Sequence, residues 1–291
     1  MIHRAFPNQR RYSPGFTRVE ALALIVAILV LVSLQVPSHG DARRVSRASV
    51  CLAGMRQLQL GWTLYAADHE GRVVSGGEGA NTPPSGPDWS AAVYLDYSSS
   101  PQNYDPARFP GRSPLRPYAG SDPLTYRCPS DPGRVRARLP GMTQFAPVPR
   151  TRSRSLNCWV GGPAWVASAP WRYATSVDQL ADPGPANTFT FVDEREDSIN
   201  DGTLLIDMTG FEGPNHQPAN PQQTRIIDYP AYWHRGGAAV AFADGHVGVR
   251  KWRDERTTPR PRSGILIPLN VASPRNPDVT WLQEHSPRLA P

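Results

Sequence analysis

The chain lacks the short motifs that mark several common kinds of site. No cysteines or histidines stand at the paired spacing of a zinc motif, and the Gly-x-Ser-x-Gly elbow of serine hydrolases does not occur. The sequence contains no recognised nucleic-acid-binding motif, and 31 basic against 25 acidic side chains leave a net charge of only +6. We therefore expect neither an enzyme nor a nucleic-acid partner.

Hydrophobic side chains are also scarce. They make up 39% of the 291 residues, whereas prolines number 32 and glycines 24. This composition is typical of a loop-rich extracytoplasmic domain with short strands, and it disfavours a helical bundle. The chain beyond the first 70 residues is long enough for one sizeable domain. We divide it into a loop-rich variable region at 71–127 and a globular β-rich head at 128–291.

The most informative segment is Pro14 to Val32. Gly15 ends a basic leader, Phe16 opens a hydrophobic helix, and Glu20 lies near the start of that helix. A signal peptide carries its cleavage site after the apolar core, but here the small residue precedes the core. The pattern Gly-Phe-Thr-x-x-Glu resembles that of type IV prepilins and type II secretion pseudopilins. The alternative is a plain N-terminal membrane anchor.

This resemblance implies processing and assembly. A prepilin peptidase would remove the leader, residues 1–15, by cutting between Gly15 and Phe16, and Phe16 would then be N-methylated. Glu20 would meet the N-terminal amine of a neighbouring subunit. The implied partners are the prepilin peptidase, other pilin or pseudopilin subunits, and the inner membrane.

An N-terminal helix is expected over residues 16–70. Residues 16–36 are long enough, at about 1.5 Å per residue, to cross a hydrocarbon core of about 30 Å. The arginines of the leader favour a single-pass protein of the inner membrane, with a cytoplasmic N-terminus and a periplasmic or extracytoplasmic head. After a break at Pro37, apolar residues recur at steps of three and four and predict an amphipathic helix: Val45, Ala48, Leu52, Met55, Leu58, Trp62 and Tyr65. The helix should stop at Asp68 to Gly71.

The three cysteines cannot all pair within one chain. Cys51 and Cys128 stand in surroundings similar to those of cysteines in relatives of this family, so the resemblance implies a Cys51–Cys128 disulfide in an oxidising compartment. Buried free thiols are the alternative. Because neither cysteine has a Cys or His partner nearby in sequence, we expect no zinc site.

A second motif lies near the C-terminus. His234 and Asp244 are separated by nine residues, and Gly245 follows. This resembles the H-x9-D-G motif of a bacterial prepilin-processing-associated family. Asp-Gly between the short runs Ala238–Ala243 and His246–Trp252 predicts a hairpin with a two-residue turn. A structural role is favoured; metal or ligand contact is an alternative, and catalysis lacks a nucleophile.

An acidic segment follows a predicted strand. Hard cations such as Ca²⁺ bind several carboxylate and carbonyl oxygens, so calcium is the cofactor to consider here. The spacing is not that of an EF-hand, and the alternative is a solvated loop neutralised by Arg195. The proposed ligands are Asp193, Glu194, Asp197 and Asp201.

Together these features predict an α+β, pilin-like fold, in which a long, partly transmembrane helix packs on a small, mostly antiparallel sheet. The expected function is a subunit of a type II secretion pseudopilus or a type IV pilus-like filament. The alternative is a membrane-anchored surface protein that binds glycan or another ligand through aromatic side chains such as Trp159, Trp165, Trp171 and Trp233. More often, such aromatic residues form the core of a loop-rich domain, and that role is favoured here.

Overall fold

The computed structural model divides into two compact units, residues 1–45 and 46–291, which are described separately. The leader and the cleavage residues Gly15 and Phe16 lie outside the described residues, as does Pro37. The side chains of residues 31–45 are also outside the description. The described residues are 17–35, 39–77, 86–162, 171–212, 218–262 and 264–289.

Helix α1 (Arg18–Gln35) begins with a reciprocal cap. The Thr17 hydroxyl accepts a hydrogen bond from the Glu20 backbone N–H at 3.2 Å. In return, the Glu20 carboxylate accepts from the Thr17 backbone N–H at 2.9 Å and from its hydroxyl at 2.8 Å. This Thr-x-x-Glu arrangement is a capping box, and it explains locally why the helix starts here.

Among the helices that the structure describes, none is both long enough and apolar enough to cross a membrane. The expectation of a single-pass inner-membrane protein with an extracytoplasmic head is therefore wrong. The 18 residues of α1 rise about 27 Å, against a hydrocarbon core of about 30 Å, and two charged residues occupy its first turn. The helix expected over 16–70 forms as α1 and a second helix, α2 (His39–Asp68), on either side of residues 36–38.

Helix α2 carries the predicted amphipathic stripe into the second unit. Met55, Leu58, Trp62 and Tyr65 are buried, together with Cys51. The helix ends at Asp68, where Glu70 and Gly71 adopt positive φ, as the stop signal predicts.

Two glycines allow close packing of α2 against the short helices α3 (Arg116–Ala119) and α4 (Pro123–Tyr126). A Cβ at Gly54 would lie 2.0 Å from the Leu124 carbonyl oxygen, and one at Gly61 would lie 2.5 Å from Ala119 Cβ. No side chain fits at either position without moving the backbone.

The second unit is built on a five-stranded sheet in the order β5-β3-β4-β7-β8. All neighbours are antiparallel except β3 and β5, which are parallel, so the sheet is mixed. The chain is α+β and most strand pairs of this sheet are antiparallel, but the expected pilin-like fold with a long, partly transmembrane helix is wrong, because no described helix is long and apolar enough to cross a membrane. The strands are β3 (Arg154–Asn157), β4 (Phe189–Asp193), β5 (Thr203–Leu204), β7 (Gly237–Phe242) and β8 (Val247–Lys251).

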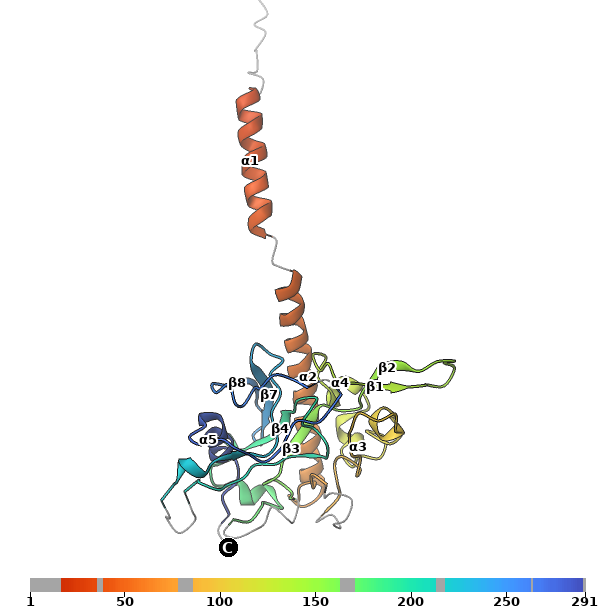
Figure 1. Cartoon of the computed structure of the whole chain (residues 1–291), viewed down its shortest axis with the longest axis vertical. Helices are drawn as coiled ribbons and strands as arrows, with labels where there is room; N and C mark the ends of the chain where they lie inside the picture. Colours follow the sequence, from red (N-terminus) through yellow and green to blue (C-terminus); the bar gives the residue numbers. More distant parts are fainter. Residues whose placement is uncertain are drawn as a thin grey trace, which may run out of the picture. The chain divides into compact units, whose positions relative to one another are not determined.

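The core lies on both faces of this sheet. Alternate residues of β7 point to opposite faces, as the pleat requires. Ala239 and Ala241 join the cluster that contains the buried stripe of α2, whereas Ala238 and Val240 join a cluster with Leu282 of α5 (Pro277–Glu284). The sheet therefore lies between α2 and α5, as Figure 1 shows.

The loop-rich region also contributes to the core. Trp89 and Phe109 are fully buried and contact each other edge to face, and Trp89 also contacts Phe191 of β4. The remaining elements are short: η1 (Pro101–Asn103), η3 (Val177–Leu180), η4 (Pro221–Gln223), the hairpin of β1 (Arg134–Ala137) and β2 (Ala146–Pro149), and the pair β6 (Arg225–Ile226) and β9 (Val271–Ala272).

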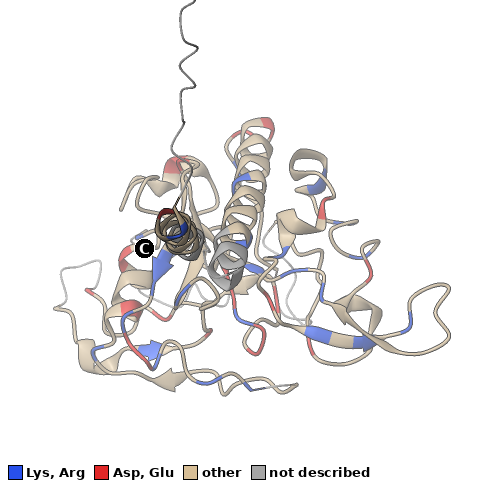
Figure 2. Cartoon of the chain, turned by 90° about the horizontal axis from the view of Figure 1, so that it is seen from above, with Lys and Arg blue, Asp and Glu red and all other residues tan. Residues whose placement is uncertain are grey.

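Charged side chains are distributed through the second unit. Figure 2 shows basic and acidic segments in several parts of its ribbon. Several arginines are fully buried: Arg150, Arg152, Arg154 and Arg195. Buried charges of this kind require partners inside the fold.

Candidate metal centre

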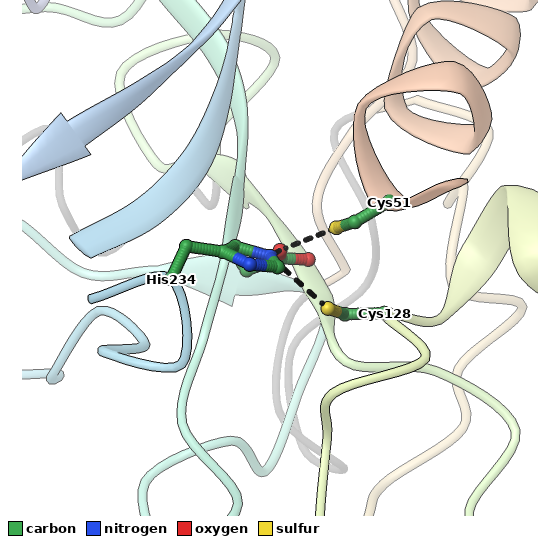
Figure 3. Close-up of side chains that lie close together, drawn as sticks. Cys51, Cys128 and His234 are labelled. Atoms are coloured by element: carbon green, nitrogen blue, oxygen red, sulfur yellow. Dashed lines mark hydrogen bonds and ion pairs between the residues drawn. The ribbon is translucent and has the colours of Figure 1, made fainter. Parts of the chain in front are cut away.

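Four side chains from four separate segments meet between α2 and the sheet. Cys51 lies on α2, Cys128 follows α4, Asp193 ends β4, and His234 lies shortly before β7. Figure 3 shows Cys51, Cys128 and His234 projecting toward one point from three directions. One ligand atom from each of the four residues lies within 4.8 Å of every other, and all four residues are buried.

The individual contacts are close. Cys51 Sγ donates to Asp193 Oδ2 at 3.0 Å, and Cys128 Sγ lies 3.3 Å from His234 Nε2. His234 Nε2 lies 3.8 Å from Asp193 Oδ2. The two sulfur–partner contacts therefore join into one cluster through the contact between the histidine and the carboxylate.

Backbone interactions fix the segments that carry these residues. The Cys128 backbone N–H donates to the Ser153 hydroxyl at 2.8 Å, next to β3. The Asp193 carbonyl accepts from Ala231 N at 2.7 Å, and His234 N donates to the Gly237 carbonyl at 3.0 Å. Between His234 and Gly237 the chain turns, and Arg235 and Gly236 adopt positive φ there. This turn directs the histidine away from β7 and toward the cluster.

A buried arginine completes the surroundings. Arg154 Nε lies 3.5 Å from Asp193 Oδ1, and both side chains are fully buried. The same guanidinium donates to the Cys51 carbonyl at 2.9 Å and to the carbonyl of Thr125 just before α4 ends. Arg154 therefore links the carboxylate to the two helical segments that bring in the cysteines.

The environment changes the acidity of each group. Its contact with Cys128, together with burial, raises the pKa of the Cys51 thiol well above its usual value. Burial alone would raise the pKa of Cys128, but Cys51 and His234 lower it below the usual thiol value. Burial alone would lower the pKa of His234, but Cys128 and Asp193 raise it above its usual value. Burial raises the pKa of Asp193. Cys128 is therefore the thiol that loses its proton more readily.

The structure does not bring the four expected calcium ligands together. Only Asp193 faces the cluster. Both Glu194 oxygens accept from serine hydroxyls, Asp197 pairs with Arg195, and Asp201 accepts from Thr203. Among the described residues, the group of Cys51, Cys128, Asp193 and His234 is the one whose ligand atoms lie close enough to share an ion. Calcium binding by the acidic segment stays an untested prediction.

The H-x9-D-G motif separates into two roles. His234 belongs to the buried cluster, whereas Asp244 Oδ1 lies 2.6 Å from His246 Nδ1 in an exposed turn. The predicted hairpin forms between β7 and β8, but the turn is one residue longer than expected. Phe242 N donates to the His246 carbonyl and Gly245 N donates to the Phe242 carbonyl, so the loop is Ala243, Asp244 and Gly245. Gly245 has φ +98°, and Asp244 is not among the residues with positive φ.

The other residues singled out in the sequence lie in both units of the chain. Glu20 lies in the first unit, in the capping box of α1. Cys51 and Cys128 are free thiols in the structure, and their sulfur atoms lie within 4.8 Å, so their disulfide stays a prediction. Trp159 and Trp171 are buried in the core beside α5, and Trp165 lies outside the described residues.

Two features of the site could not be found from the sequence: the position of Arg154 beside Asp193, and the zinc-type set of donor atoms. Nothing in the sequence marks Arg154, which is one of three arginines between residues 150 and 154. The expectation of no zinc site rests on the spacing of cysteines and histidines in the sequence. This spacing gives no information when each ligand comes from a different segment of the chain.

In comparisons with protein-family models, curated proteins and solved structures, no match to this chain was found.

Proposed function

We propose that this chain is a prepilin-type subunit that is cut between Gly15 and Phe16 and then assembles, through its N-terminal helix, into a pseudopilus or pilus-like filament. The proposal rests on the Gly-Phe-Thr-x-x-Glu pattern and on the exposed apolar surface of α1. The compact unit of residues 46–291 would be the part that each subunit displays.

The surface of α1 is the observation that carries this proposal. Its large hydrophobic side chains are exposed on successive positions, including Leu24 (52%), Ile25 (53%) and Val26 (53%). Successive helical residues are about 100° apart, so these side chains face in several directions. A helix that is apolar all round is stable in water only when other apolar surfaces cover it. Equivalent helices of neighbouring subunits would supply that cover.

The charge of Glu20 also supports assembly through the N-terminal helix. Its carboxylate accepts two hydrogen bonds from Thr17, and these hydrogen bonds lower the pKa of Glu20. The side chain therefore stays ionised at neutral pH. Cleavage before Phe16 would create a positively charged amine close to this carboxylate's position in the helix. A carboxylate in an apolar helix bundle needs such a cationic partner, and the amine of the next subunit would provide it.

Photo-crosslinking of the full chain tests assembly. A crosslinking amino acid in place of exposed Ile25 should give a ladder of multimers when a prepilin peptidase is present. The same amino acid in place of Arg138, which is exposed in the loop between β1 and β2, should give none. Processed chains that form no multimers from position 25 would contradict the proposal.

A further inference from the structure

We propose that Cys51, Cys128, Asp193 and His234 bind one zinc ion, which joins α2 to the sheet. This inference goes beyond the proposed function, because it concerns the second unit and needs neither processing nor assembly. It rests on the identity, placement and charge of the residues in the cluster.

The donor set is that of a structural zinc site. Zinc in proteins is bound by four ligands drawn from cysteine sulfur, histidine nitrogen and carboxylate oxygen. Two soft sulfurs disfavour calcium and magnesium, which take oxygen ligands. With zinc about 2.0–2.3 Å from each donor, donor atoms of a tetrahedral site lie roughly 3.3–3.8 Å apart. The contacts of 3.3 Å (Cys128–His234) and 3.8 Å (His234–Asp193) lie within this range, and the Cys51–Asp193 contact of 3.0 Å is shorter, as a direct hydrogen bond without metal requires.

The charges also balance. Without metal, the Asp193 carboxylate is offset by Arg154, and Cys51, Cys128 and His234 together are neutral, wherever their shared proton lies. When Zn²⁺ binds, both thiols lose their protons to solvent, and the two thiolates offset the two positive charges of the metal. The net charge of the buried cluster with Arg154 is zero in both states. Zinc therefore enters without leaving an uncompensated charge in the core.

Arg154 is placed to support the metal. Asp193 Oδ1 is buried and accepts no hydrogen bond, and it lies 3.5 Å from Arg154 Nε, while Oδ2 contacts Cys51 and His234. Arg154 thus pairs with Oδ1 by charge, and the thiol proton that Cys51 donates to Oδ2 would leave when zinc binds, so that Oδ2 becomes a ligand and Arg154 an outer-shell partner. Arg154 is a positioning residue and not a ligand.

The closed surroundings indicate a structural role for the metal. The side chains of His234 and Asp193 are 4% and 0% exposed, and protein supplies all four donors. A catalytic zinc keeps one position for water or substrate, and this cluster offers none. The ligands span the chain from α2 to the loop before β7, so a bound ion would tie together segments that are distant in sequence.

Metal analysis of the purified full chain tests the site. After dialysis against zinc and then buffer, the wild-type chain should retain one zinc per chain. Substitution by cobalt should give thiolate-to-cobalt charge-transfer absorption together with the intense ligand-field bands of a tetrahedral site. Cys128→Ser and Asp193→Asn should each lower the affinity for zinc by about tenfold or more, the scale seen even for outer-shell partners.

Matched controls separate the site from general effects on folding. Cys158→Ser removes another buried cysteine, and Asp244→Asn neutralises another aspartate; neither residue belongs to the cluster. Both variants should bind zinc like the wild type. Circular dichroism should show that each cluster variant still folds, and cobalt spectra of Cys51→Ser provide a second measurement if one variant does not.

Two results would overturn the proposal. A wild-type chain prepared under reducing conditions that retains no zinc, with thiol titration showing three free cysteines, would make the cluster a set of buried hydrogen bonds. A chain that loses two hydrogens in mass and holds a Cys51–Cys128 disulfide after exposure to excess zinc would assign the two sulfurs to a covalent bond instead.

Discussion

Cys51 and Asp193 are 142 residues apart in sequence, yet the Cys51 sulfur donates a hydrogen bond to the Asp193 carboxylate at 3.0 Å. This contact joins α2 directly to the end of β4. The surrounding side chains are buried, so the contact belongs to the interior of the second unit.

Removing metal should destabilise the chain. A ligand that binds only the folded state at 100 times its dissociation constant adds about 2.7 kcal/mol, which corresponds to a rise of roughly 5–10 °C in Tm for a unit of this size. We therefore expect a strong zinc chelator to lower Tm by that amount, as followed by differential scanning calorimetry. Zinc added back should restore Tm in the wild type but not in Cys128→Ser. Equal melting curves with and without chelator would contradict a structural zinc.

Glu194 should make stability fall as pH rises. Burial, the largest cause, raises its pKa from 4.5 to about 8, although hydrogen bonds from Ser155 and Ser198 oppose the shift. Below pH 4.5 both folded and unfolded chains hold the proton, and above pH 8 neither does. Between these values only the folded chain holds it, so stability falls by at most about 1.4 kcal/mol per pH unit in this window.

Glu194→Gln tests this dependence, because glutamine resembles the protonated acid. Urea unfolding between pH 5 and 8 should show a smaller decrease in the variant than in the wild type. Asp201 and Asp228 have raised pKa values as well, also mainly from burial, so part of the decrease should remain. Glu70→Gln, at an exposed position, should leave the profile unchanged. Parallel profiles for the wild type and Glu194→Gln would show that Glu194 is not the group responsible.

Gly245→Val should destabilise the second unit by roughly 1–3 kcal/mol, because a β-branched residue resists the φ of +98° at this position. Gly248→Val is the matched control. Neither site has an atom within 4 Å of an added Cβ, but Gly248 lies in β8 without positive φ. Chemical denaturation should show a loss of stability only for Gly245→Val. Equal effects at both positions would rule out backbone strain as the cause.

Several features could be predicted from the sequence because they are local. The stripe of α2 follows from helical spacing, its end from the glycine after it, and the β7–β8 hairpin from Asp-Gly between two apolar runs. The extra residue in that turn was missed, because Asp244 takes an ordinary φ and only Gly245 needs a positive one. The parallel pairing of β3 with β5 joins short strands that no local pattern could match.

The cluster could not be predicted, although all four of its residues were singled out. The sequence suggested Cys51 and Cys128 as a disulfide, Asp193 as a calcium ligand and His234 as part of a hairpin motif. Each assignment used neighbours in sequence, whereas the site is made by packing α2 and the segment after α4 against one end of the sheet. Only the fold shows that three separate suggestions concern one place.

Glu20 should be needed for assembly through its charge. Glu20→Gln keeps a residue that can complete the capping box but removes the charge, whereas Glu20→Ala removes both. We expect both variants to lose the crosslinks from position 25, while the Tm of the second unit stays unchanged. If Glu20→Gln assembles normally and only Glu20→Ala fails, the side chain acts as a helix cap and not as a charged partner.

The mass of the mature chain tests the central claim most directly. The full chain is expressed together with a prepilin peptidase, purified, and measured by intact-mass and N-terminal peptide spectrometry, with a Gly15→Val variant as the uncut control. The account predicts loss of residues 1–15 and a mature chain that begins with Phe16 carrying one added methyl group. A wild-type chain that still begins at Met1 in the presence of an active peptidase would contradict it.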